Sequence, residues 1–466
     1  MAELTIDGKG VATAERFPVA NPATGEELDR APVAGPAELD AAVAAARAAW
    51  PAWRADREAR ADALRASAAR LLDEIDALST TLTGEQGKPV RDARVEVKMM
   101  AAWFEHALGL DLGPTVVRED ESTRVEVRLE PVGVVAALTP WNFPLALSAW
   151  KLAPALWAGN VAVLKPSPLT PLSTLMVGAT LRETLPPGVL NVLSGPEPLG
   201  RMLVEHEGVD KVSFTGSIGV GRSVAEAGAA RLRRDTLELG GNDAAVVLDS
   251  ADPAAIASEL AGSAFVNCGQ VCSAIKRVYA PRGRAAELAA AIGEAAVALT
   301  VGDGADRATR MGPLASPAGR DRVEELIADA KAGGAEVIAG GSRIRRPGWF
   351  HEPTVLLVDD PRARVVLEEQ FGPVLPIVPY DSVEEAVALA NDTEFGLGGS
   401  VWGDEDEARA VGDGLECGTV WHNTHVVVGP EQPFGGWKQS GAGVENGPWG
   451  LDEFTRLRTL HTRRSR

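Results

Sequence analysis

From residue 131 onward, short apolar runs alternate with segments of helical length, and this rhythm limits the possible folds more than any other feature. Helix-sized segments such as 170–184 and 217–230 separate several of the runs. Strands joined through helices need right-handed crossovers, so the pattern predicts a parallel sheet and an α/β fold. The runs before residue 250 are GVVAAL, NVAVLK, VLNVL, KVSFTG, TLELGG and AAVVLD. A second set between residues 276 and 423, which predicts a second α/β domain, comprises KRVYA, AEVIAGG, PTVLLV, VLPIVPY and GTVWHN.

Two further patterns precede residue 131. Residues 36–82 are alanine-rich and charged, and apolar side chains at helical spacing predict helices with an interruption at Pro51. Residues 124–130, RVEVRLE, alternate valine and leucine with charged side chains. This alternation predicts a strand with one exposed face.

Length and composition exclude several classes of protein. A chain of 466 residues is expected to form roughly two to four domains. No apolar run approaches the roughly 18–20 residues that span a bilayer, and the opening MAELTIDGKG lacks the regions of a signal peptide. We therefore expect a soluble, cytoplasmic protein with no membrane partner. A net charge of −19 argues against nucleic-acid binding, because a surface that follows phosphates is basic.

The stretch FVNCGQVCSA, residues 265–274, holds two of the three cysteines, Cys268 and Cys272. Three cysteines in so long a chain favour a reducing compartment over a disulfide framework. A zinc site is poorly supported, because Cys417 stands alone and His422 and His425 are the only close histidine pair. We expect no metal. Packing and catalysis both remain open for Cys272, whose neighbours are small or polar residues suited to an accessible turn.

Polar residues follow several predicted strands, and ligands of parallel sheets gather at such ends. Lys165 ends NVAVLK, where its cation could meet a phosphate or a hydroxyl, or could simply be a surface lysine. The glycines of KVSFTGSIGVG permit close approach of a phosphate to a helix N-terminus, or form an ordinary turn. Glu238, in TLELGGND, precedes Cys272 by 34 residues, which is enough for a strand and a helix. The two side chains could therefore meet as base and nucleophile.

Taken together, these motifs resemble the NAD(P)-dependent aldehyde dehydrogenase superfamily, in the family's order and over nearly the whole chain. They are NPATGEEL at 21–28, PWNFP at 140–144, LKPSP at 164–168, FTGS at 214–217, LELGG at 237–241, NCGQVC at 267–272, EEQFGPV at 368–374 and PFGGWKQSGAG at 433–443. The joint pattern is highly specific, although each motif alone is not.

The resemblance implies that Cys272 is the nucleophile and Cys268 a packing residue. The Cys272 thiolate would attack an aldehyde carbon to give a thiohemiacetal, and loss of hydride to NAD(P)+ would leave a thioester. Asn142 and the backbone N–H of Cys272 would bind the oxyanion, and one such donor is typically worth about 3–4 kcal/mol of barrier. Glu238 would activate the water that hydrolyses the thioester. Lys165 is carried over with the catalytic residues as well as with those that bind the cofactor.

The resemblance also implies a cofactor site. Lys165 and Ser167 would face the adenosine ribose, and Gly216 and Ser217 the pyrophosphate. Members that prefer NAD often have glutamate where this chain has Pro168, so we expect NAD, with NADP or dual use also possible. The remaining cofactor residues, near the nicotinamide and its ribose, would be Trp141, Leu239, Glu369 and Phe371.

The substrate pocket implied by the resemblance is largely apolar and contains no arginine. It predicts a hydrophobic aldehyde, aliphatic or aromatic. The alternatives are a semialdehyde dehydrogenase and a CoA-acylating enzyme, although the latter branch typically lacks the glutamate found here as Glu238. A thiol hydrolase without redox chemistry and a non-catalytic protein fit the motifs less well. The pocket residues would be Phe143, Leu147, Trp150, Val271, Ser273, His425, Val426 and Phe434.

The resemblance finally implies three structural parts and a homodimer or homotetramer. A Rossmann-like cofactor-binding domain would comprise residues 1–111 and 131–238, and an α/β catalytic domain residues 239–437. A small β oligomerisation element would comprise residues 112–130 and 438–466. The alternating strand at 124–130 suits this element, since an exposed strand edge invites a partner.

Overall fold

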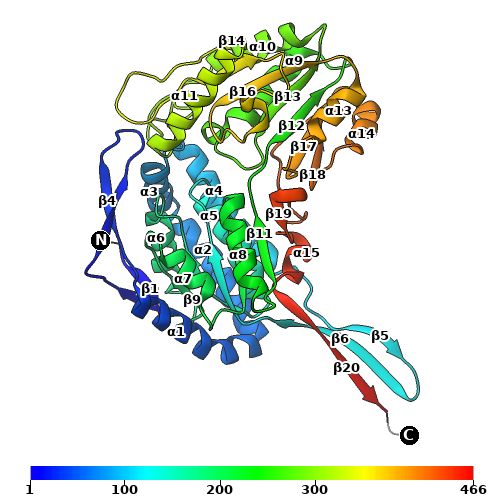
Figure 1. The fold of residues 1–466 in the computed structure, drawn as a ribbon. Coiled ribbons are helices and arrows are strands. Elements are labelled where there is room, and N and C mark those ends of the chain that lie inside the picture. The colour runs from blue at the N-terminus through cyan, green and yellow to red at the C-terminus, as the bar shows by residue number, and fades with distance from the viewer. Residues whose placement is uncertain (1, 465–466) are drawn as a thin grey trace.

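Two large, mostly parallel sheets organise the chain in the computed structural model, which describes residues 2–464. They lie in two lobes that meet at the middle of the molecule, and a narrow β-arm projects from one of them (Figure 1). The predicted α/β class is therefore confirmed.

The first lobe contains an eight-stranded sheet in the order β19-β11-β10-β7-β8-β9-β1-β2. The five strands from β11 to β9 run parallel, and the pairs at the two edges are antiparallel. The strands are β1 (Leu4–Ile6), β2 (Lys9–Val11), β7 (Val134–Leu138), β8 (Val161–Lys165), β9 (Leu190–Val192), β10 (Lys211–Thr215), β11 (Asp235–Glu238) and β19 (Gly441–Ala442).

Strand order in this sheet is that of a Rossmann-like unit. The chain passes from β7 outward to β8 and β9, then returns to place β10 and β11 on the other side of β7. Such a reversal leaves a crevice at the carboxyl ends of the strands, which is where ligands bind in open α/β sheets. Every residue of β7, β8 and β10 is buried, and this explains their continuous apolar runs, since helices cover both faces of a parallel sheet.

The helices of the first lobe are α1 (Pro36–Ala55), α2 (Arg57–Asp73), α3 (Ile75–Gln86), α4 (Val90–Ala107), α5 (Pro144–Trp157), α6 (Leu172–Leu181), α7 (Leu199–Glu205) and α8 (Ile218–Ala229). The predicted helical segments 170–184 and 217–230 correspond to α6 and α8. All fourteen residues of α5 are buried, and this helix packs against α4.

The predicted interruption at Pro51 is wrong, because α1 continues through this residue to Ala55. The break falls at Asp56, whose carboxylate accepts a hydrogen bond from Ala59 N and caps α2. Trp53 lies beyond the proline, is buried, and donates its indole N–H to Leu156 O at 3.2 Å. This packing offsets the backbone hydrogen bond that proline removes from the helix.

The second lobe contains a seven-stranded sheet in the order β14-β15-β16-β13-β12-β17-β18. Only β14 is antiparallel to its neighbour. Its strands are β12 (Asp243–Val247), β13 (Ile275–Pro281), β14 (Glu336–Ala339), β15 (Thr354–Leu357), β16 (Val374–Tyr380), β17 (Gly398–Trp402) and β18 (Thr419–His422). Its helices are α9 (Pro253–Phe265), the 3-10 turn η1 (Val266–Gly269), α10 (Ala285–Val297), α11 (Pro317–Ala332), α12 (Arg364–Leu367), α13 (Val383–Asn391) and α14 (Glu405–Gly412).

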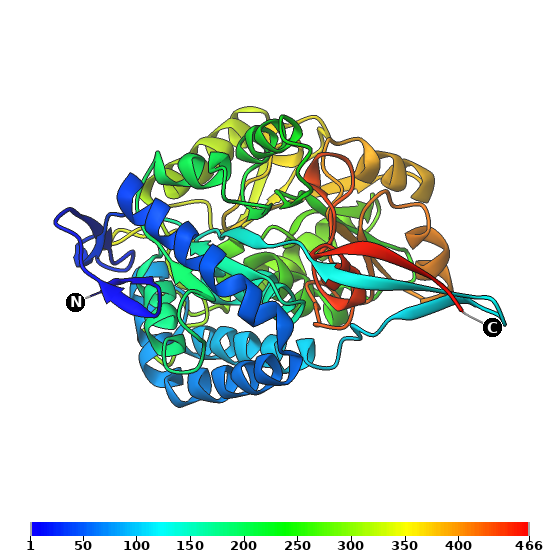
Figure 2. The same ribbon diagram turned by 90° about the horizontal axis from the view of Figure 1, so that it is seen from below.

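The β-arm is a three-stranded antiparallel sheet in the order β20-β6-β5, formed by β5 (Thr115–Glu119), β6 (Thr123–Pro131) and β20 (Thr455–Arg463). The alternating segment 124–130 lies within β6, as predicted, but its two faces do not differ in burial as expected, because Glu126 is buried and the valine and leucine side chains are half-buried. Figure 2 shows the arm extending away from the body, on the side opposite the N-terminus. The remaining elements are the hairpin β3 (Arg16–Ala20) and β4 (Glu27–Pro32), the turn η2 (Lys438–Ser440) and α15 (Gly447–Asp452).

Candidate active site

Cys272 lies in a tight turn between η1 and β13. Asn267, Cys268 and Gly269, just before it, all have positive φ angles, of 50°, 59° and 71°. Such angles strain residues other than glycine, and strain of this kind gathers at functional sites. Cys268 is 1% exposed, whereas Cys272 is only partly buried. The turn therefore presents the second cysteine and encloses the first.

Two glycines bring Glu238 to this turn. A Cβ atom on Gly241 would lie 2.5 Å from the carbonyl oxygen of Cys272, and one on Gly240 would collide with the Glu369 carboxylate. The backbone that follows β11 therefore packs directly against the cysteine turn, at a distance that only glycine allows. The LELGG segment, the cysteine and Glu369 meet at one place.

Asn142 lies in the loop between β7 and α5 and reaches the same turn. Its side-chain amide donates a hydrogen bond to Gln270 O at 3.0 Å, and its own carbonyl accepts one from the Asn267 side chain at 3.1 Å. The Lys88 ammonium also donates to this carbonyl, at 2.7 Å. Lys88 is paired with buried Glu96. Asn142 is thus held in position from both lobes.

The Glu238 carboxylate is 3% exposed, and neither of its oxygens has a hydrogen-bond partner. Burial raises its pKa well above the usual range, and the neighbouring Glu445 raises it further. Glu445 forms a fully buried ion pair with Lys151 at 2.6 Å, and Lys151 acts on Glu238 in the opposite direction. A buried carboxyl group with a raised pKa and free oxygens is suited to proton transfer.

Burial raises the pKa of the Cys272 thiol to about 12. Lys276 opposes this shift, and the carboxylates of Asp243, Glu238 and Glu369 add to it. Burial alone raises the pKa of Cys268, even further. Of these two cysteines, Cys272 is therefore the one whose ionisation is altered by charged groups around it.

The residues predicted to bind the dinucleotide lie at the carboxyl ends of β8 and β10. Lys165 ends β8, and its ammonium donates one hydrogen bond, to Pro166 O at 3.2 Å. Ser217 caps α8 through a bond from Val220 N at 3.5 Å, next to Gly216. A Cβ atom on Gly219 would meet nothing within 4 Å, so the first turn of α8 is open to a ligand.

Ser167 accepts a hydrogen bond from Leu169 N. Leu239 packs on Gly221 of α8, where a Cβ atom would lie 2.5 Å from the leucine. No hydrogen bond or ion pair within residues 2–464 connects Lys165 with Cys272 or Glu238. The assignments of Lys165 to the catalytic residues and to the cofactor residues both stay predictions.

Trp141 and Phe371 meet edge to face, with ring centroids 5.4 Å apart. Phe371 has a φ angle of 47°, a strained value for an aromatic residue. Glu369, two residues earlier, accepts a hydrogen bond from Gly241 N at 3.2 Å and lies 3.4 Å from the Lys276 ammonium. The predicted nicotinamide-side residues are thus adjacent to the cysteine turn.

The predicted pocket residues form two groups of contacts. The rings of Trp150 and Phe434 lie 5.2 Å apart, and Trp103, which the sequence motifs missed, stacks on Trp150 at 6.0 Å. His425 Nε2 lies 3.0 Å from Ser273 O and 3.6 Å from the Asp243 carboxylate. The other predicted members are Phe143, beneath the Lys88 ammonium at 3.8 Å, the buried Leu147 and Val271, and Val426 with a φ angle of 61°.

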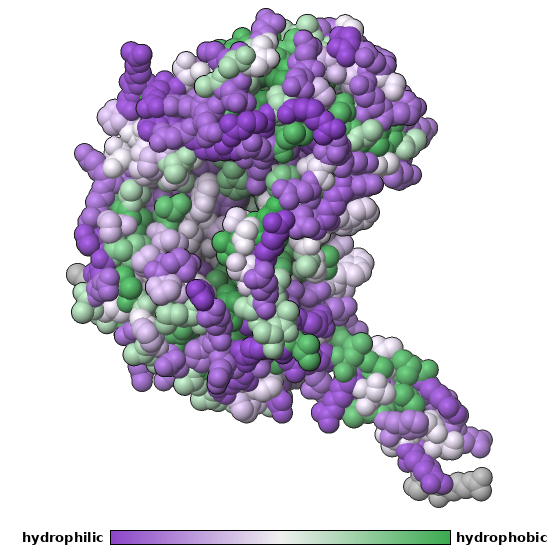
Figure 3. Space-filling model, viewed as in Figure 1, coloured by the Kyte–Doolittle hydropathy of each residue, from purple (hydrophilic) through white to green (hydrophobic). Residues whose placement is uncertain are grey.

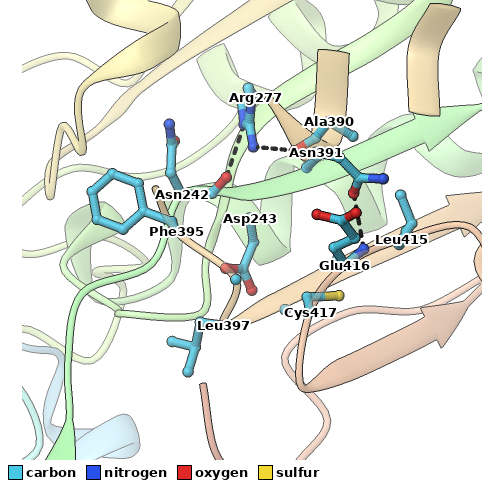
Figure 4. Close-up of a pocket in the computed structure, with 14 residues that line it drawn as sticks. Asn242, Asp243, Arg277, Ala390, Asn391, Phe395, Leu397, Leu415, Glu416 and Cys417 are labelled. Carbon is cyan, nitrogen blue, oxygen red and sulfur yellow. Dashed lines mark hydrogen bonds between the residues drawn. The ribbon is translucent and has the colours of Figure 1, made fainter. Parts of the chain in front are cut away.

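Behind the site, Asp243 faces a small cavity whose lining includes Asn242, Leu397 and Cys417 (Figure 4). Asp243 is 1% exposed, and neither carboxylate oxygen has a hydrogen-bond partner. Sequence motifs did not indicate this residue, nor the buried charges Lys88, Glu96, Lys151, Lys276 and Glu445. The one available signal was a charged residue within an apolar run, as for Lys276 in SAIKRVYA.

Within residues 2–464, no group of three or more histidine, cysteine, aspartate or glutamate side chains is arranged to hold a metal ion. Across the same residues, no helix has both the length and the apolar character that a membrane crossing requires.

Comparison with known proteins identifies the family. The sequence model of the Aldehyde dehydrogenase family matches residues 11–460. The chain is 40% identical over 472 residues to geranial dehydrogenase of Castellaniella defragrans, covering 98% of each chain. It is 38% identical over 462 residues to 3-sulfolactaldehyde dehydrogenase of Pseudomonas putida, covering 97% of this chain and 95% of the relative.

Among solved structures, the NAD+ complex of an aldehyde dehydrogenase from Bacillus cereus superposes with a TM-score of 0.96 at 33% identity. The match covers 99% of this chain and 96% of that chain. The resemblance inferred from the motifs is confirmed, and the chain belongs to the aldehyde dehydrogenase family.

Proposed function

We propose that this aldehyde dehydrogenase oxidises hydrophobic aldehydes to carboxylic acids through a covalent intermediate on Cys272, with NAD+ as its preferred cofactor. One observation carries the proposal. The Cys272 turn is in direct contact with the Gly241 backbone that follows Glu238, and the Asn142 amide donates to Gln270 in the same turn. A nucleophile, a base and an oxyanion donor are thus adjacent.

The covalent chemistry uses this chain's own residues. The Cys272 thiolate attacks the aldehyde carbon, and the carbonyl oxygen becomes an oxyanion. An amide has two N–H groups, and the Asn142 amide donates one to Gln270, which leaves the second for the oxyanion, together with the Cys272 backbone N–H. Oxidation leaves the acyl group on sulfur as a thioester. Glu238 then takes a proton from the water that attacks the thioester carbon, and the acid and the thiolate are released.

The predicted cofactor residues fit a nicotinamide dinucleotide. The open N-terminal turn of α8 suits a pyrophosphate, and the Lys165 ammonium, with a single backbone partner, suits ribose hydroxyls. When bound, the nicotinamide would supply the acceptor for the hydride of the aldehyde carbon. The Bacillus cereus relative supports NAD+. Because Pro168 offers no carboxylate to repel a 2′-phosphate, we expect measurable use of NADP+ as well.

A hydrophobic substrate is favoured by the aromatic contacts of Trp150 with Phe434 and Trp103. The relative named for geranial supports this choice, whereas the relative named for 3-sulfolactaldehyde supports a polar one. The predicted pocket residues include no arginine, which is the side chain best suited to bind a carboxylate or sulfonate. A CoA-acylating reaction is disfavoured because Glu238 is present to hydrolyse the thioester.

The decisive experiment follows nicotinamide reduction by absorbance at about 340 nm with a panel of aldehydes. The panel comprises aliphatic aldehydes of increasing chain length, benzaldehyde and succinic semialdehyde, each with NAD+ and NADP+ and with and without CoA. We expect the highest kcat/KM for hydrophobic aldehydes with NAD+, independent of CoA. Succinic semialdehyde as the best substrate would refute the substrate class, and an absolute need for CoA would refute hydrolysis.

The β-arm supports a homodimer or homotetramer. Its three strands lie outside the body, and they expose apolar side chains at Val116, Val117 and Leu457 (Figure 3). Leu457 is 76% exposed, and such side chains on a free sheet edge favour burial against a second copy. Light scattering at micromolar concentration should give a dimer or tetramer mass, which Leu457→Asp should lower. A monomer mass for the unaltered protein would contradict the proposal.

A further inference from the structure

Lys276 is the second residue of β13, and its side chain is 3% exposed. Its ammonium donates hydrogen bonds to Val271 O at 2.7 Å and to Cys272 O at 2.5 Å. It also lies 3.4 Å from the Glu369 carboxylate and 5.9 Å from the centre of the Phe371 ring. A single buried cation thus binds the backbone of the cysteine turn and one of the predicted cofactor residues.

The adjacent cation, Arg277, makes different contacts. Successive side chains of a strand point to opposite faces, and Arg277 points away from the cysteine turn. It donates to Asn242 O at 2.8 Å and to Ala390 O at 2.8 Å, which connects β13 to the residue before β12 and to α13 (Figure 4). Lys276 is therefore the cation of this pair that faces Cys272.

The charges that face Cys272 are mostly negative. Glu238 at the end of β11, Asp243 at the start of β12, and Glu369 after α12 all disfavour a thiolate. His425, from the loop after β18, contacts Ser273 O rather than the thiol. Lys276 is the cation that favours the thiolate among the groups acting on Cys272. Without it, a half-buried sulfur would ionise among three carboxyl groups.

We propose that Lys276 is a positioning residue for catalysis, which fixes the Cys272 turn through its two carbonyl contacts and supplies the positive charge that permits the thiol to ionise. The thiol proton leaves to Glu238 or to solvent. Glu369 shares the same ammonium, so the carboxylate competes with the thiolate for its charge. The inference rests on the proposed function, since it takes Cys272 as the nucleophile.

The experiment measures the rate at which iodoacetamide alkylates Cys272 in the folded, cofactor-free protein. The modified peptide is quantified by mass spectrometry, and all variants are compared at one pH chosen between about 8 and 9.5. Iodoacetamide is uncharged and reacts with the thiolate, so its rate reports the thiolate fraction. Lys276→Gln retains an N–H donor for the two carbonyls but removes the charge. Lys276→Arg retains the charge. Lys211→Gln serves as the matched control, because Lys211 is also a buried lysine. It begins β10 and contacts Thr236 and Glu453 instead of the cysteine turn.

We expect Lys276→Gln to slow alkylation about tenfold, which corresponds to one pKa unit. Lys276→Arg and Lys211→Gln should stay within about threefold of the unaltered protein. Glu369→Gln should accelerate alkylation, because the Lys276 ammonium then stabilises the thiolate without a competing carboxylate. This opposite sign distinguishes a charge effect from general loosening, which would accelerate the reaction in every variant.

Equal rates in Lys276→Gln and the unaltered protein, or equal slowing in the Gln and Arg variants, would overturn the proposal. Alkylation of buried Cys268 reports unfolding in the same digest. If Lys276→Gln unfolds by that measure, the Glu369→Gln variant decides, and an unchanged rate there also overturns the proposal. These outcomes are independent of the proposed function, which fails instead if Cys272→Ala retains dehydrogenase activity.

Discussion

The surroundings of Cys268 and Cys272, four residues apart in the chain, differ in charge as well as in burial. Burial is the one cause that raises the pKa of Cys268. Cys272 has Lys276 and three carboxyl groups around it, supplied by elements from both lobes. Two thiols of nearly the same sequence neighbourhood thus have different chemistry available. Position relative to distant charges, rather than local sequence, makes one of them a candidate nucleophile.

The largest test of this contrast exchanges each cysteine for alanine. Cys272→Ala removes the atom that carries the acyl group, so we expect dehydrogenase turnover to fall below detection, by about 10⁴-fold or more. Cys268→Ala shortens a packing side chain and should leave kcat within about twofold. Steady-state kinetics of both variants provides the measurement. Comparable losses in the two variants would remove the distinction between the two sites.

Glu238→Gln tests the proposed base, which ends β11 and lies beside the cysteine turn. General bases typically contribute about 10²–10⁴-fold, and we expect a loss of this size in steady-state kcat, with an initial burst of reduced cofactor as the thioester accumulates. The raised pKa of Glu238 fixes the direction in which the rate of thioester hydrolysis should change with pH. The carboxylate forms as pH increases through that pKa, so thioester hydrolysis should accelerate with pH. Stopped-flow traces across pH should show this acceleration in the unaltered protein and its absence in the variant.

The smallest effect per unit of pH is expected for the thiol itself. Because the pKa of Cys272 is raised to about 12, the thiolate fraction should grow about tenfold per pH unit below that value. The rate of iodoacetamide alkylation at Cys272 should therefore increase from pH ~7 to ~10 without a plateau. Cys268 in the same protein should remain unmodified while the fold is intact. A plateau near pH ~8 at Cys272 would contradict the raised pKa of this thiol.

The sequence predicted the α/β class and the family, because buried strands and turn glycines leave local patterns. It missed the continuation of α1 through Pro51, since the packing of Trp53 against Leu156 depends on a segment about a hundred residues away. For the site, the motifs predicted Cys272, Glu238 and Asn142, whose proposed roles await the experiments above. These residues do lie together around one turn.

The buried charges could not be predicted from the sequence. Glu445 acts on Glu238 only because β19 brings the C-terminal segment against β11, and nothing in the segment GAGVENG suggests a buried ion pair with Lys151. From the sequence alone, Lys276 resembles a solvated lysine beside an apolar run. Only the folded structure shows that Glu369 lies next to its ammonium. Long-range pairs of this kind depend on tertiary contacts rather than on local spacing.

The pairing of β19 with β11, and of β20 with β6 over nine residues, also bears on how the protein is made. A nascent chain that has reached the end of β18 already holds Cys272, Glu238 and every parallel strand of both sheets. It still lacks Glu445 and the edge strand beside β11, so the site acquires its full set of charges only after the segment that follows β18 has been synthesised. The charged groups that act on Cys272 are therefore all synthesised before the end of β18, whereas Glu238 gains the influence of Glu445 only later.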